Sequence, residues 1–277
     1  LPDSALKELA AHDAILFGAV GADPRGNALI PQGLIETDIL LRMRFELDQY
    51  VNLRPTKLLP GVPTPLANIQ PGDIDMVIVR ENTEGLYCGN GGFLYKNTPH
   101  EVANQIEVTT RHGVERAIRY AFDYARRNNR KKVTCFTKDN IMKLTDGLFH
   151  KVFDEIAIEY PELENEHWIV DIGAAKLADT PTVFDVLVMP NLYGDVLSDV
   201  AAQIAGSVGL AGSANIGENI AMFEAIHGSA PRRAGRLIRE NAGVAFEPES
   251  GAALTLNGAP VNGRVQLGAR LIVAKVQ

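Results

Sequence analysis

The chain has few cysteines, no excess of positive charge and no long apolar run. Only two of its 277 residues are cysteine, Cys88 and Cys135, which argues against a disulfide scaffold and favours a reducing, cytoplasmic compartment. Its net charge of −7 argues against nucleic acid as the main partner. No run approaches the ~20 apolar residues that a membrane helix needs, and no signal peptide is visible, so we expect no membrane partner.

The common signatures of nucleotide and zinc sites are also absent. The sequence has no G-x-G-x-x-G fingerprint and no P-loop. Its histidines show no zinc spacing, and its two cysteines form no C-x-x-C pair. The sequence therefore predicts neither a standard Rossmann fold nor a zinc site.

Short apolar runs alternate with helical patterns along most of the chain. Residues 109–128 and 140–159 each place apolar side chains on one helical stripe. Alternating strands and helices predict an α/β fold with an open, mostly parallel sheet covered on both faces. The tail after about Arg236 has no sustained helical period and predicts short strands and turns, or a poorly specified chain. The predicted strands are residues 14–20, 56–59, 75–79, 133–136, 168–172 and 184–189.

Asp195 and Asp199 lie four residues apart, after an apolar strand and before a loop rich in glycine and serine. Residues at this spacing share one face of a helix, and two carboxylates on one face can hold a hard divalent cation. Taken alone, the pair favours a solvated acidic face on a surface helix over a cation site. Asp171, at the end of the predicted strand 168–172, is a candidate third carboxylate.

Several residues are suited to bind or protonate an acidic substrate. Arg44 lies in a helical pattern, Arg54 precedes a proline, and Arg80 ends an apolar strand, where ligand crevices form in α/β sheets. Guanidinium groups bind carboxylates through paired hydrogen bonds. Tyr87 can give a proton, and Lys138 can accept one if its pKa is lowered.

Seven motifs in order carry a resemblance to a known family: VNLRP, VRENTEGLY, TKDNIMK, VD at 170–171, NLYGDVLSD, GSxGLxxSANIG and HGSAP. Over residues 1–236 the chain resembles the β-decarboxylating dehydrogenases, the isocitrate/isopropylmalate dehydrogenase family. The resemblance implies a two-lobed, isopropylmalate-dehydrogenase-like fold. Residues 1–49 and 206–277 would form an incomplete cofactor-binding lobe. Residues 50–205 would form the substrate and dimerisation lobe, with an arm, or a long loop, at about 87–107.

The resemblance implies metal-dependent oxidative decarboxylation of a 3-substituted malate, a hydroxy-dicarboxylate or tricarboxylate, by NAD or NADP. Tyr87 would be the general acid and Lys138 the general base. The substrate would be bound by Leu40, Leu41, Arg44, Arg54 and Arg80. Mg²⁺ or Mn²⁺ would be held by Asp171, Asp195 and Asp199. The cofactor would be bound by Asn215, Gly217, Glu224, His227, Gly228, Ser229, Ala230 and Arg232.

The resemblance also implies a homodimer with shared active sites. Lys138 and Asp171 would reach into the partner's site, and the arm would form part of the dimer clasp. No nucleic acid or membrane partner is implied.

The substrate's variable group is predicted from Leu40 and Leu41. Apolar side chains suit an isopropyl group, and burying a carboxylate against them would be costly, so we predict 3-isopropylmalate and a role in leucine biosynthesis. Other segments, such as TKDNIMKLTDGLF, are closer to isocitrate dehydrogenases. Isocitrate, homoisocitrate, tartrate and malate therefore remain alternatives.

Two departures from the family pattern bear on activity. Arg232 and Arg233 stand where NAD-linked members carry an aspartate, which favours NADP because a cation pairs with its 2′-phosphate. The family's opening strand and GDGIGPE-like loop are not present, and the tail is atypical, so we expect a chain truncated at its N-terminus. A second hypothesis is therefore an inactive fragment or a non-catalytic binding subunit.

Overall fold

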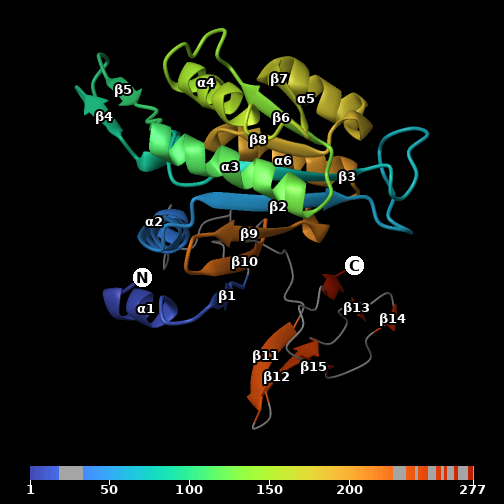
Figure 1. Cartoon of the computed structure of the whole chain (residues 1–277). Helices are drawn as coiled ribbons and strands as arrows, with labels where there is room; N and C mark the ends of the chain where they lie inside the picture. Colours follow the sequence, from blue (N-terminus) through green and yellow to red (C-terminus); the bar gives the residue numbers. More distant parts are fainter. Residues whose placement is uncertain are drawn as a thin grey trace.

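The structure is a computed structural model that describes residues 1–18 and 34–226, together with the backbone of short strands between 235 and 276. An eight-stranded mixed sheet forms its centre (Figure 1). The strands follow one another across the sheet in the order β1 (Ala14–Leu16), β10 (Ala221–Ala225), β9 (Gly212–Ile216), β2 (Val51–Lys57), β3 (Asp75–Glu81), β8 (Val186–Met189), β6 (Lys132–Thr137) and β7 (Glu164–Ile169).

The sheet is mostly parallel, as predicted. The parallel pairs are β1–β10, β3–β8, β6–β8 and β6–β7. The antiparallel pairs β9–β10, β2–β9 and β2–β3 lie together in its middle. The helices of the described residues are α1 (Asp3–Leu9), the π-helix η1 (Glu36–Leu41), α2 (Arg42–Glu46), α3 (Arg111–Arg127), α4 (Thr145–Ala157), α5 (Val170–Asp179), α6 (Asn191–Ile204) and the short 3-10 turns η2 (Leu86–Cys88), η3 (Pro181–Val183) and η4 (Val208–Leu210).

Helices cover both faces of the sheet, which explains why the inner strand β8 is apolar throughout. In β8, Val186 and Val188 face the core that contains α3 and α4, whereas Leu187 and Met189 face the core that contains α6. Successive strand side chains point to opposite faces, so a strand buried on both sides alternates between two cores. This arrangement confirms the predicted helices 109–128 and 140–159 within a few residues.

A smaller core lies where α1, α2, β1 and β10 meet. Leu6, Ile15, Met43 and Met222 are buried there together. The predicted lobes share one continuous sheet, since β9, which follows the predicted boundary at 205/206, pairs with β2, which precedes it. The boundary itself stays a prediction.

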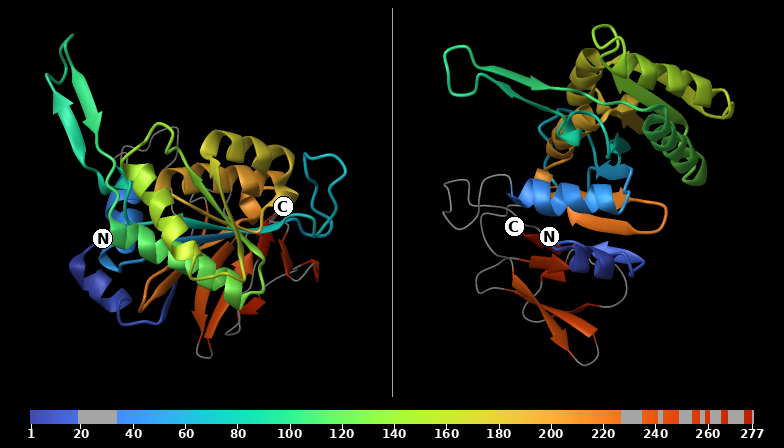
Figure 2. Two further views of the ribbon diagram at one scale, coloured as in Figure 1. Left: turned by 45° about the horizontal axis from the view of Figure 1, so that its top comes forward. Right: turned by 90° about the vertical axis from the view of Figure 1, so that its left-hand side faces the viewer.

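The predicted arm is a hairpin rather than a long loop. Strands β4 (Gly91–Leu94) and β5 (Val102–Gln105) pair antiparallel and project away from the rest of the molecule (Figure 2). Its side chains are exposed, including the apolar Phe93, Leu94 and Val102. A single chain therefore gives this hairpin no apolar partner among the described residues.

Three sequence predictions are wrong in detail. Asp171 does not end a strand, because β7 ends at Ile169 and Asp171 lies in the first turn of α5. The edge strand β7 begins with the polar residues 164–166, which an apolar pattern misses. Residues 212–216, predicted as a Gly/Ser loop, form the inner strand β9. Strand β2 runs from Val51 to Lys57 rather than over 56–59. The prediction missed its start because the buried polar residues Asn52 and Arg54 interrupt the apolar pattern.

The tail forms short strands, as predicted. The described strands are β11 (Gly235–Glu240), β12 (Gly243–Pro248), β13 (Leu254–Leu256), β14 (Ala259–Pro260), β15 (Val265–Leu267) and β16 (Ala274–Val276). They pair into two small antiparallel sheets, β11–β12–β15 and β14–β13–β16. Among the described residues, no helix has the length and apolar character needed to cross a membrane.

Candidate active site

Helix α6 starts directly after β8 and carries the aspartate pair over the sheet. A Cβ atom on Gly194 would lie 2.6 Å from Cβ and Cγ of Arg80, closer than real contacts allow. Glycine at this position therefore lets α6 approach β3 closely. The approach brings Asp195 within hydrogen-bonding reach of side chains on β2 and β3.

Asp195 is the centre of a group of four side chains, which we call the Asp195 group. Arg54 Nη2 donates to Asp195 Oδ1 at 3.0 Å, Arg80 Nη1 donates to the same oxygen, and the Tyr87 hydroxyl donates to Oδ2 at 2.6 Å. The side chains of Arg54 and Arg80 are 3% and 1% exposed, whereas Asp195 is 38% exposed. Two buried cations thus point toward a carboxylate at the surface.

The two arginines are held in place by neutral partners that the sequence analysis did not identify. Arg80 Nε donates to Asn191 Oδ1 at 2.9 Å, and Arg54 Nη1 donates to Ser198 Oγ at 2.6 Å. Arg54 Nε donates to Asn52 Oδ1. Asn191 and Ser198 share the helical face of Asp195, at spacings of four and three, so this periodicity could have indicated them.

Burial and mutual charge shift the pKa values of the Asp195 group. Burial, with the nearby charge of Arg54, lowers the pKa of Arg80 to about 10, and burial also lowers the pKa of Arg54. Burial raises the pKa of Asp195, but Arg80 and Arg54 outweigh it, so the pKa is lowered overall. Burial raises the pKa of Tyr87. At neutral pH the group therefore holds two cations, one carboxylate and a protonated phenol, which suits an anionic ligand.

Asp199 lies one helical turn beyond Asp195. Its Oδ1 is 3.7 Å from Arg54 Nη1, and its side chain is 35% exposed. Carboxylate oxygens are the donors that Mg²⁺ and Mn²⁺ prefer, so this face of α6 fits such a cation chemically. In the described residues Asp171 does not join Asp195 and Asp199 in a common cluster of ligand atoms. One chain therefore brings together two of the three predicted metal ligands.

Lys138 and Asp171 form a separate pair. Lys138 follows β6 directly, and its Nζ donates to Asp171 Oδ2. The two side chains are 25% and 65% exposed. The buried carboxylate of Asp146 accepts the backbone N–H of Lys138 and so fixes the start of this loop. In the described chain, neither Lys138 nor Asp171 makes a hydrogen bond or ion pair with the Asp195 group.

Arg44 forms its ion pair with Glu224 rather than with Asp195, although its charge acts on Arg54 and Arg80. Its Nη2 donates to Glu224 Oε1 at 2.9 Å, and both side chains are buried. Asn215 Nδ2 also donates to Glu224 Oε1, at 2.7 Å, and Asn215 Oδ1 accepts from Asn52 Nδ2 at 2.8 Å. Because Asn52 also contacts Arg54, a continuous chain of hydrogen bonds joins the predicted cofactor residues to the predicted substrate residues.

The remaining predicted binding residues differ in their surroundings. Leu40 and Leu41 end the π-helix η1 and are half-buried, and Leu40 packs against the small core around Met43. Gly217 lies in a tight turn, where a Cβ would be 3.0 Å from the carbonyl oxygen of Asp48. The predicted cofactor loop lies outside the described residues: His227, Gly228, Ser229, Ala230 and Arg232.

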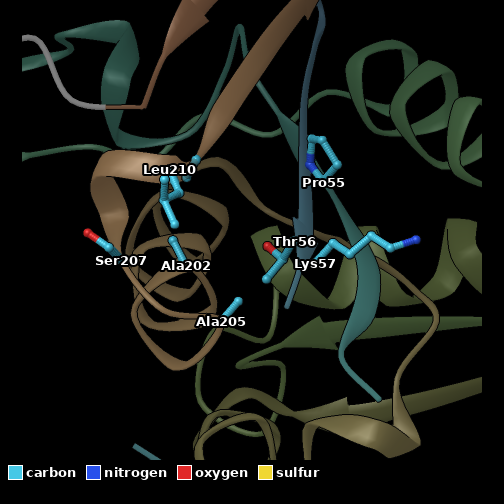
Figure 3. Close-up of a pocket in the computed structure, with 8 residues that line it drawn as sticks. Pro55, Thr56, Lys57, Ala202, Ala205, Ser207 and Leu210 are labelled. Atoms are coloured by element: carbon cyan, nitrogen blue, oxygen red, sulfur yellow. The ribbon is translucent and has the colours of Figure 1, made fainter. Parts of the chain in front are cut away.

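A shallow pocket lies at the far ends of β2 and α6 (Figure 3). It contains none of the predicted site residues. Its only charged side chain, Lys57, already pairs with Asp75 at 2.7 Å. The chemistry therefore favours the Asp195 group over this pocket as the functional site. The pocket is lined by Pro55, Thr56, Lys57, Ala202, Ala205, Ser207, Leu210 and Ala211.

Comparison with known proteins identifies the family of the chain. Residues 1–245 match the family profile described as isocitrate/isopropylmalate dehydrogenase. The chain belongs to this family. It is 49% identical over 239 residues to the 3-isopropylmalate dehydrogenase of Clavibacter michiganensis subsp. michiganensis, covering 85% of this chain and 66% of that protein.

A second curated protein and a solved structure are also similar to this chain. The chain is 48% identical over 243 residues to the 3-isopropylmalate dehydrogenase of Corynebacterium diphtheriae, covering 87% of this chain and 70% of that protein. The crystal structure of isocitrate dehydrogenase from Methylococcus capsulatus matches with a TM-score of 0.73 and 43% identity, over 83% of this chain and 64% of that one. The chain thus spans about two thirds of the length of these relatives, and the predicted fold class is confirmed.

Proposed function

We propose that the protein carries out the NAD- or NADP-dependent oxidative decarboxylation of a 3-substituted malate, with 3-isopropylmalate as the substrate. The observation that carries the proposal is the Asp195 group, in which two buried arginines and a tyrosine meet at an exposed carboxylate. Such a set of donors is suited to a dicarboxylate, because guanidinium groups bind carboxylates through paired hydrogen bonds.

In this proposal Arg54 and Arg80 bind substrate carboxylates, and Arg44 assists from the Glu224 side. Asp195 and Asp199, together with Asp171 of a second copy, hold Mg²⁺ or Mn²⁺. The cation would supply Lewis acidity at the C2 oxygen of the substrate. The exposure of Asp171 supports a role at another surface, as in a homodimer with shared sites.

Two side chains would move protons. Tyr87 holds its proton at Oη, because burial raises its pKa, and would deliver it to the substrate carbon after CO₂ leaves. Lys138, from the second copy, would take the proton of the C2 hydroxyl. Asn215, Gly217 and Glu224 would position the nicotinamide cofactor, which accepts the hydride.

The variable group of the substrate separates the two candidate reactions. The relatives named 3-isopropylmalate dehydrogenase and the half-buried Leu40 and Leu41 favour 3-isopropylmalate. The relative named isocitrate dehydrogenase, at 43% identity, keeps isocitrate as the second candidate.

The test is an assay of NADH or NADPH formation by purified protein with Mg²⁺ or Mn²⁺. Each acid is offered in turn: 3-isopropylmalate, isocitrate, homoisocitrate, tartrate and malate. The highest kcat/KM is expected with 3-isopropylmalate, and a strong preference for isocitrate would reverse the substrate assignment. Formation of neither reduced cofactor with any acid would favour the non-catalytic subunit instead. Tyr87→Phe provides the control for chemistry at the Asp195 group.

The choice of cofactor is a separate part of the proposal. Arg232, which lies outside the described residues, favours NADP through its charge. Comparing kcat/KM for NAD and NADP tests this, and Arg232→Asp is expected to reverse a preference for NADP. A clear preference of the unmodified protein for NAD contradicts it.

A further inference from the structure

Two histidines and an aspartate from three separate elements meet beside Lys138. Asp139 follows β6, His150 lies on α4, and His167 lies on β7. One ligand atom from each lies within 4.8 Å of the others, and all three side chains are half-buried. The sequence shows no zinc spacing here, because residues that meet through sheet pairing and helix packing carry no local pattern.

The fold explains the meeting. β6 and β7 are parallel, and His167 lies opposite Cys135, whose side chain faces the core under α4. His150 lies on the helix that covers this face, and its ring stacks on that of His167 with centroids 3.5 Å apart. Asp139 Oδ2 lies 2.7 Å from His150 Nδ1.

The donor set is that of a transition-metal site rather than a magnesium site. Two imidazoles and one carboxylate suit Zn²⁺, Co²⁺ or Ni²⁺, whereas Mg²⁺ prefers oxygen donors. Burial and the neighbouring His150 lower the pKa of His167, so its ring is in the neutral form that binds metals. Burial raises the pKa of Asp139, but the hydrogen bond from His150 outweighs it and lowers the pKa overall.

Binding requires a small rearrangement. Ligand atoms around a tetrahedral Zn²⁺ lie roughly 3.4 Å apart, given bonds of about 2.0–2.1 Å, so the three groups must draw together. Stacked rings direct their lone pairs side by side, and one imidazole must therefore turn about its Cβ–Cγ bond. His150 has room to turn, because its side chain is 26% exposed. On its other side, Asp154 Oδ1 lies 3.7 Å from its Nε2.

We propose that Asp139, His150 and His167 form a second divalent-metal site that is selective for Zn²⁺-like ions over Mg²⁺. Solvent completes the coordination on the exposed side. The site ties α4, β7 and the loop after β6 together around Lys138. The Thr137 hydroxyl lies 2.8 Å from His167 Nε2, so both residues that flank Lys138 contact the histidine pair.

The test measures metal binding in excess Mg²⁺, which is expected to occupy the proposed carboxylate site on α6. Zn²⁺ is followed by calorimetry and Co²⁺ by its visible absorption. One ion per chain is expected to bind. His150→Ala and His167→Ala are each expected to weaken binding by at least about 100-fold, because even outer-sphere partners of ligands contribute 10- to 100-fold.

Control variants distinguish Zn²⁺ binding at this cluster from binding at other residues of the chain. His112→Ala removes an exposed histidine on α3 and is expected to leave binding unchanged. Asp195→Asn is also expected to leave it unchanged, since Asp195 belongs to the carboxylate site. His150→Gln and His167→Asn keep polar side chains and serve where alanine prevents folding, as judged by circular dichroism. Absence of Zn²⁺ binding in excess Mg²⁺, or binding that survives loss of both histidines, would overturn the proposal.

Discussion

The Asp195 group and the Lys138–Asp171 pair are both made of opposite charges, yet they differ in burial. The arginines of the first are 3% and 1% exposed, whereas Lys138 and Asp171 are 25% and 65% exposed. The first group is fixed within one chain by Asn52, Asn191 and Ser198.

Burial determines which of these two regions a single chain can hold in place. A buried charge without its partners is costly, so the arginines of the Asp195 group depend on the contacts around them. An exposed ion pair contributes only about 0–1 kcal/mol, so the position of Lys138 and Asp171 depends on what covers them. In the proposed function the first region binds the substrate, and the second meets a second copy of the chain.

The sharpest way to test this division is complementation between variants. Arg80→Met is expected to lower kcat/KM by about 100- to 1,000-fold, because it removes a buried donor for the substrate. Asp171→Asn is expected to lower kcat/KM by a similar factor. In a dimer with shared sites, coexpressing the two variants leaves one intact site per heterodimer, which returns roughly a quarter of wild-type activity for random pairing.

The control for complementation uses two variants of the same region. Arg80→Met and Tyr87→Phe both damage the Asp195 group, so their heterodimer has no intact site. Coexpression of this pair is expected to restore nothing. Equal recovery in both mixtures would show that the two regions do not belong to different copies.

The next largest effect concerns the approach of α6 to β3. Gly194→Ala is expected to lower the free energy of unfolding by about 3 kcal/mol, because its Cβ would lie 2.6 Å from Arg80. Gly147→Ala, in a helix where a Cβ meets nothing within 4 Å, should raise it by about 0.5–1 kcal/mol. Urea denaturation of both variants measures the contrast, and equal effects would contradict the close packing.

A smaller effect compares the two aspartates directly. Asp195→Asn leaves Arg54 and Arg80 without their carboxylate and is expected to lower the free energy of unfolding by about 2 kcal/mol. Asp171→Asn should change it by less than about 1 kcal/mol. Both are measured on the protein without substrate or metal. A larger loss for Asp171 would reverse the comparison.

The smallest expected effect concerns Asp75, whose side chain is more exposed than the arginines of the Asp195 group and less exposed than Asp171. Asp75 pairs with Lys57 and Arg130; burial raises its pKa, but these partners outweigh it and lower the pKa overall. A carboxylate whose pKa is lowered by folding stabilises fully above its unfolded pKa of about 3.9, and the contribution is lost as the pH falls through the folded pKa.

Denaturation between about pH 5 and pH 3 tests this expectation. The wild type should exceed Asp75→Asn in free energy of unfolding at the upper end. The two should converge at the lower end. A difference that grows as the pH falls would contradict the pairing.

Local patterns in the sequence predict much of the fold. The α3 and α4 helices follow from apolar stripes, and β8 from a continuous apolar run. The predictions fail where a buried residue is polar, since periodicity treats polar residues as exposed. Asn52 and Arg54 hide the start of β2, and Ser213 and Asn215 make β9 resemble a loop.

The site was predictable only as far as its motifs extend. Asp195, Asp199 and the arginines lie in recognisable segments, but Arg54 and Asp195 are 141 residues apart in the chain. Their contact depends on tertiary packing, which no local pattern contains. The same limit explains why the cluster of Asp139, His150 and His167 was missed.

The pairing of β1 has a consequence for synthesis of the chain on the ribosome. Within the part of the chain that the structure describes, β1 pairs only with β10, and Ile15 packs with Ile220 and Met222, about 200 residues later in the sequence. At 5–20 residues per second, roughly 10–40 seconds pass before these partners emerge. β3, β6, β7 and β8 pair among themselves and can assemble first. Strand β1 therefore stays without its β10 partner while the middle of the chain is translated.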